Sequence, residues 1–78
     1  MDVERLTDLA RATAGERPLT GLDAVAQIRR EMERTEAVLV RRARNDGATW
    51  AEIAAILGIS KQAVHKKYGG RGLLRSQP

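Results

Sequence analysis

The residues best suited to chemistry in this chain are hydrogen-bond donors gathered between positions 60 and 68. Lys61 and Lys66 carry ammonium groups that can donate to O6 and N7 of guanine, and the Gln62 amide can pair with N6 and N7 of adenine. His65 is the only histidine, and its ring can contact a base or a phosphate. We therefore predict that Lys61, Gln62, His65 and Lys66 contact DNA bases.

Two short helices are predicted to carry these donors. Thr49 and Glu52, three residues apart, fit a capping box that starts the first helix. An apolar face follows at the spacing i, i+3, i+4 and i+7: Trp50, Ile53, Ala54 and Leu57. Gly58 supplies a left-handed turn residue that a β-carbon would penalise.

The second helix is expected to begin after Ser60 as its N-cap and to end at Gly69-Gly70. Ala63, Val64 and Tyr68 are predicted to face inward, which would turn the lysine-bearing side outward. A capped apolar helix, a glycine turn and a basic helix are the parts of a helix-turn-helix, whose second helix enters the DNA major groove.

The segment WAEIAAILGISKQAVHKKY resembles the helix-turn-helix of sigma-factor region 4 and of recombinase and homeodomain-like bacterial DNA-binding proteins. The residues that carry the resemblance are Ile53-Ala54, Leu57-Gly58-Ile59-Ser60, Val64 and Tyr68. It covers residues 50–68 and implies a fold without implying a target sequence. The wider layout, with two helices before the motif and the ending KKYGG, is similar by analogy to Fis-type nucleoid proteins.

Charge is divided unevenly along the chain. Residues 1–40 hold six arginines and eight acidic residues, whereas residues 41–78 hold eight Lys or Arg and two acidic residues. A basic C-terminal half indicates a polyanionic partner, and phosphate contacts set affinity and register on DNA. The candidate phosphate contacts are Thr49, Ser60, Lys67, Arg71, Arg41, Arg44 and Arg75.

Two further helices are predicted before the motif. The first spans about residues 3–14, with Asp2 as its N-cap, and the second runs from a capping box at Thr20 and Asp23 to about Asn45. The long helix carries an apolar stripe near coiled-coil spacing, which would cover the first helix or, as we favour, form a homodimer. The residues of the stripe are Leu22, Val25, Ile28, Met32 and Leu39.

The predicted fold is all-α, with about four helices in a single domain over residues 1–78. Residues 1–46 would support or dimerise the protein, residues 49–68 would form the helix-turn-helix, and residues 69–78 would be a flexible basic tail or an arginine arm in the minor groove.

Several functional classes are disfavoured by the inventory of residues. The chain has no cysteine and one histidine, so we expect no metal site, no cofactor and no enzyme activity. Trp50 and Tyr68, the only aromatic residues, stand at core positions, which argues against single-stranded nucleic acid as the partner. No segment looks like a membrane span or a signal peptide, so a cytoplasmic, nucleoid-associated protein without a small-molecule ligand is expected.

The sequence thus predicts a small bacterial transcriptional regulator that binds double-stranded DNA. Two alternatives stay open at this point. One is a nucleoid-architectural protein with little sequence preference, and the other is a protein-interaction adaptor whose helix-turn-helix is vestigial.

Overall fold

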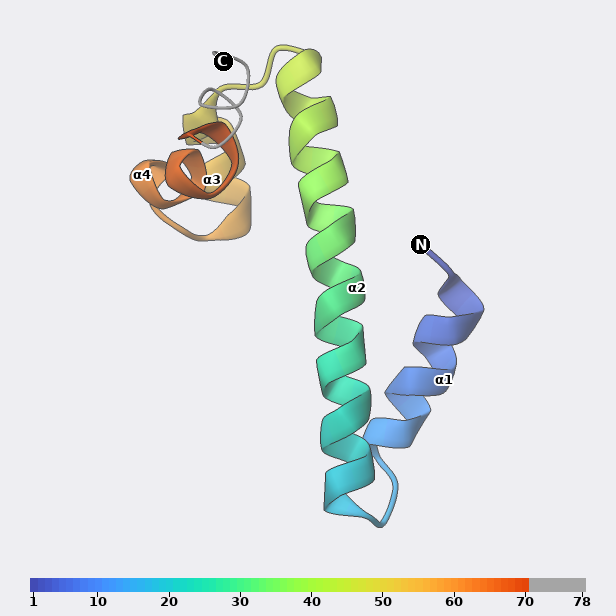
Figure 1. Ribbon diagram of the computed structural model, residues 1–78. Coiled ribbons are helices and arrows are strands. Elements are labelled where there is room, and N and C mark those ends of the chain that lie inside the picture. Colours follow the sequence, from blue (N-terminus) through green and yellow to red (C-terminus); the bar gives the residue numbers. More distant parts are fainter. Residues whose placement is uncertain (71–78) are drawn as a thin grey trace. The chain divides into compact units, whose positions relative to one another are not determined.

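A computed structural model describes residues 1–70 and shows four α-helices without strands over that range. In chain order they are α1 (Val3–Thr13), α2 (Pro18–Asn45), α3 (Trp50–Leu57) and α4 (Lys61–Val64), and a π-helical turn η1 (His65–Gly70) continues α4 (Figure 1). This arrangement confirms the predicted all-α class with about four helices. The described residues divide into two compact units, 1–36 and 37–70, which we describe separately.

The first unit is a helical hairpin in which α1 folds back beside the first half of α2 (Figure 1). The Asp2 carboxylate accepts a hydrogen bond of 3.1 Å from the Arg5 backbone N–H, as expected of an N-cap. The helix ends at Thr13, one residue before the expected end. Gly21 of α2 is buried, and a β-carbon there would lie 3.2 Å from the Thr13 carbonyl oxygen, so the hairpin leaves little room for a side chain at this point.

The start of α2 differs from the sequence prediction. The helix begins at Pro18 rather than after Thr20, so Thr20 and Asp23 lie inside it and form no capping box. Proline is favoured at the first helical position because its fixed φ suits a helix and its missing N–H is not needed there. The Gly21 N–H already donates to the Arg17 carbonyl at 3.0 Å.

Polar side chains join the two helices of the hairpin. Arg5 donates to the Gln27 side chain at 3.1 Å, and its Nε lies 3.5 Å from Glu31. Arg34 also donates to Glu31, at 2.7 Å. This hydrogen bond, assisted by the charges of Arg34 and Arg5, lowers the pKa of the Glu31 carboxyl from its ordinary value.

The second unit has a small apolar core. Its buried members come from the end of α2, from α3 and from α4: Val40, Ile53, Ala54 and Val64. Half-buried apolar side chains surround them: Ala43, Ala48, Trp50, Leu57 and Tyr68. Val64 has no exposed surface, which makes it the centre of this core.

The predicted capping box of α3 is confirmed. The Thr49 hydroxyl accepts from the Glu52 N–H at 3.0 Å, and the Glu52 carboxylate accepts from the Thr49 N–H at 2.8 Å. Gly58 ends the helix with φ of 72°, the left-handed conformation predicted for it. Ser60 then caps α4 by accepting from the Ala63 N–H at 3.0 Å.

One detail of the last helix was predicted wrongly. Ala63 is exposed rather than inward-facing, because the inward positions are taken by Val64 and Tyr68. The described part of the helix runs to Gly70, so both glycines of the predicted end belong to η1. Widening from α to π geometry keeps the chain helical through Gly69, which is buried.

Within residues 1–70, no helix combines the length and apolar character required to span a membrane.

Candidate nucleic-acid interface

The outward side of α4 and η1 is polar and basic. Val64 is fully buried and Tyr68 is half-buried, so these two residues, four apart, fix which side of the helix faces the core. The residues on the other sides are exposed: Lys61, Gln62, Ala63, His65, Lys66 and Lys67. At helical spacing, Gln62 and Lys66 form a row directed away from the buried pair.

The structure separates His65 from that row. Its ring lies edge-on to the Trp50 ring, with centroids 5.3 Å apart and planes at 86°. Gly69 lies beside both rings, because a β-carbon at this position would be 2.8 Å from an atom of each. His65 therefore contributes to packing, while Gln62 and Lys66 stand clear of it.

Arg44, a candidate phosphate contact, also has a structural role. Its guanidinium donates to the Ala48 carbonyl oxygen at 2.9 Å, and its central carbon lies 4.5 Å from the Trp50 ring centroid. This arrangement is a cation–π contact that ties the end of α2 to the start of α3. Arg41, three residues earlier, is exposed.

The hydroxyls of Thr49 and Ser60 are used as helix caps. Each accepts a backbone N–H, but a hydroxyl can accept one hydrogen bond and donate another. Each hydroxyl therefore keeps an O–H group that could donate a hydrogen bond to a phosphate oxygen.

The remaining candidate phosphate contacts are Lys67, Arg71 and Arg75. The ammonium of Lys67 lies 5.3 Å from the Tyr68 ring centroid. Arg71 and Arg75 lie outside the described residues.

Positive charge predominates among the described residues of the second unit. Residues 37–70 hold six Lys or Arg and two acidic residues, Asp46 and Glu52. Glu52 is committed to the capping box, where the Thr49 backbone N–H, followed by its hydroxyl, lowers the pKa of the carboxyl from its ordinary value. The exposed lysines and arginines thus outnumber the carboxylates on this unit.

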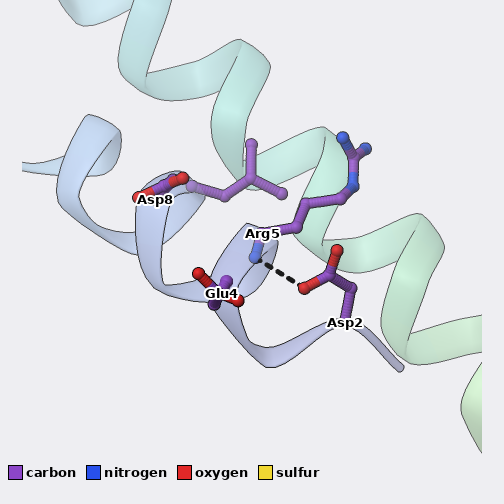
Figure 2. Close-up of a pocket in the computed structure, with 5 residues that line it drawn as sticks. Asp2, Glu4, Arg5 and Asp8 are labelled. Atoms are coloured by element: carbon purple, nitrogen blue, oxygen red, sulfur yellow. Dashed lines mark hydrogen bonds between the residues drawn. The ribbon is translucent and has the colours of Figure 1, made fainter.

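A surface hollow beside α1 offers no comparable chemistry. It is lined by Asp2, Glu4, Arg5, Asp8 and Leu9, and Figure 2 shows the Asp2 carboxylate engaged by the Arg5 backbone N–H. Arg5 itself extends to Gln27 and Glu31 of α2. Among the described residues, no three His, Cys, Asp or Glu side chains are grouped so that they could hold a metal ion.

The apolar stripe of α2 is largely exposed. The exposed fractions are 61% for Leu22, 38% for Val25, 40% for Met32 and 52% for Leu39, while Ile28 is half-buried. In the first unit the face turned to α1 carries Gly21 and Ala24 instead, and both are buried.

The contacts of Arg44 and His65 with Trp50 were not predicted from the sequence. Trp50 was correctly placed on the apolar face of α3, but its contacts with the two basic residues depend on tertiary structure. No local spacing signals them. The sequence offers one hint only: the chain has a single tryptophan, with which an arginine and a histidine could make contact.

No known protein family, curated protein or solved structure matches this chain.

Proposed function

We propose that this protein binds double-stranded DNA and acts as a bacterial transcriptional regulator associated with the nucleoid. The observation that carries the proposal is the exposed row of Gln62 and Lys66 on α4 and η1, held outward by buried Val64. A helix anchored on one side and lined with long hydrogen-bond donors on the other suits the major groove.

In this proposal, residues have distinct roles on DNA. Gln62 and Lys66 read base edges, and Lys61 contacts bases or phosphates from the first turn of α4. His65 is less suited to a base contact because its ring lies against Trp50. Phosphates are contacted by Lys67, Arg41 and the hydroxyls of Thr49 and Ser60, with a smaller part for Arg44.

The exposed methyl group of Ala63 fits the same interface. A small apolar side chain in the major groove can contact the C5-methyl group of thymine. Ala63 stands next to Gln62, which can pair with adenine, so the two together would favour A·T base pairs.

Equilibrium binding to labelled duplexes, measured by fluorescence anisotropy, tests the proposal. Gln62→Ala is expected to reduce the preference among sequences by about 1–3 kcal/mol, the value of one good base contact. Lys67→Ala should weaken binding to all duplexes about equally and should reduce the slope of log affinity against log salt by about one unit.

A matched control is available on the first unit. Arg30→Ala removes the same single positive charge as Lys66→Ala, but from an exposed site on α2 outside the proposed interface. The proposal requires Lys66→Ala to weaken binding clearly more than Arg30→Ala does. Equal effects of the two variants, together with unchanged binding by Gln62→Ala, would show that the groove-reading helix is wrongly assigned.

A further inference from the structure

The first half of α2 exposes an apolar face that the hairpin does not use. Leu22, Val25 and Met32 are 61%, 38% and 40% exposed, although α2 buries Gly21 and Ala24 against α1 on another side. Together with Arg29, these residues form a seam along the helix in which spacings of three and four residues alternate. Its members are Leu22, Val25, Arg29 and Met32. Such a seam is the packing surface of paired helices.

Charge along this seam suggests what covers it. Arg29 and Glu33 are both exposed and stand four residues apart, one turn of helix. In a parallel pair of identical helices, equal positions face each other, so Arg29 would meet Arg29 of the second copy across the seam. In an antiparallel pair centred between residues 30 and 31, Arg29 instead lies across from Met32 and beside Glu33 of the second copy.

We propose that this face of α2 binds a second copy of the chain in antiparallel orientation. A two-fold axis makes every contact occur twice, so a face that binds itself must carry both members of each charge pair. The α2 face meets this requirement with Arg29 and Glu33. The aliphatic part of Arg29 covers Met32 of the other copy, and its guanidinium reaches Glu33 there.

This inference goes beyond the proposed function, because dimer formation is measured without DNA. Sedimentation equilibrium of the full chain is expected to show a concentration-dependent monomer–dimer equilibrium. Arg29→Glu and Glu33→Arg, made singly, place like charges together and should each weaken dimerisation by about tenfold or more.

The double variant, Arg29→Glu with Glu33→Arg, determines the orientation. In the antiparallel pair it restores opposite charges at both contacts and should return the dimerisation constant to within about threefold of the original, given the usual context dependence of exposed ion pairs. In a parallel pair Arg29→Glu only replaces two facing arginines by two facing glutamates, so neither this single variant nor the double variant should change dimerisation much. Loss of dimer in each single variant, followed by recovery in the double variant, therefore identifies the antiparallel pair. Because all these sites are exposed, circular dichroism should show unchanged helix content.

A distance measurement gives a second readout. The chain has no cysteine, so Asp23→Cys can carry a single spin label. Two labels in an antiparallel pair centred at residue 30.5 would be separated by about 22 Å along the axis at 1.5 Å per residue. In a parallel pair they would be only about 10 Å apart, the usual interhelical distance.

Three results would overturn the inference: a monomer at all accessible concentrations, a short label distance, or no recovery in the double variant. A monomer that still binds DNA would leave the proposed function intact. A dimer with the predicted orientation that ignores DNA would reject the proposed function and leave this inference standing.

Discussion

Trp50 and His65 meet edge to face, with ring centroids 5.3 Å apart and an angle of 86° between the planes. The guanidinium of Arg44 lies 4.5 Å from the centroid of the same tryptophan ring. Trp50 thus joins the end of α2, the start of α3 and η1 within the second unit. These contacts of Trp50, together with the burial of Val64, fix how α4 and η1 are rotated about their axis, and so direct Gln62 and Lys66 outward.

The closest packing around Trp50 and His65 is at Gly69. A β-carbon there would lie 2.8 Å from both Trp50 Cζ2 and His65 Cδ2, closer than real β-carbons approach a neighbour. We expect Gly69→Ala to lower the free energy of unfolding by about 1–3 kcal/mol, the usual cost of overpacking. Urea denaturation followed by circular dichroism measures this loss. Repeating the substitution in a His65→Ala background should cost less, and an equal cost in both backgrounds would count against the packing described.

The contacts of Arg44 predict that it stabilises the fold. Arg44→Gln removes the cation–π contact and the hydrogen bond to Ala48, so we expect a loss of about 1–2 kcal/mol in the free energy of unfolding. Arg41→Gln makes the same change of charge at an exposed position and should alter stability by less than about 0.5 kcal/mol. Thermal unfolding of the two variants compares them directly. Equal melting temperatures would mean that the Arg44 contacts add nothing.

The centre of the core gives a sharper contrast. Val64→Ala removes two methyl groups from a site with no exposed surface and should cost about 1.5–3 kcal/mol. Ile56→Ala removes more apolar carbon, yet Ile56 is 85% exposed, so a change within about 0.5 kcal/mol is expected. Chemical denaturation should therefore rank the smaller deletion as the more damaging one. The opposite order would place the core elsewhere.

The capping box makes stability depend on pH. Because the Thr49 N–H lowers the pKa of Glu52 in the folded protein from its ordinary value of 4.5, the ionised carboxylate favours folding. This contribution is complete above pH 4.5 and is lost as the pH falls through the lowered pKa of the folded state. Glu52→Gln cannot ionise, so its deficit in melting temperature relative to the original chain should shrink between pH 6 and about pH 3. A deficit that is constant with pH would argue against an ionised cap.

Local rules explain which parts of the fold could be predicted. The α3 capping box, the left-handed Gly58 and the Ser60 cap each depend on residues within three or four positions, and all three were predicted correctly. The start of α2 was misplaced because two local signals compete there. Pro18 at the first helical position prevails over a Thr20 cap whose partner was a less usual aspartate.

Tertiary contacts explain what could not be predicted. The exposure of Ala63 and the π-helical turn follow from how Val64 and Tyr68 share one core, and no short pattern encodes this. His65 was grouped with the lysines because helical spacing alone places it near them. Only its contact with Trp50, fifteen residues earlier in the sequence, separates it from that group.

The most direct test of the central claim is selection of bound fragments from a random double-stranded DNA library at about 150 mM salt, where weak electrostatic binding is largely suppressed. We predict enrichment of a specific sequence, and the antiparallel dimer would make it an inverted repeat whose half-sites lie about 10 base pairs apart or a multiple of that spacing. Gln62→Ala should lose or change the enriched sequence. Recovery of random DNA with no preferred sequence would contradict a sequence-reading regulator, and if DNA were then retained only at low salt, the protein would be architectural instead.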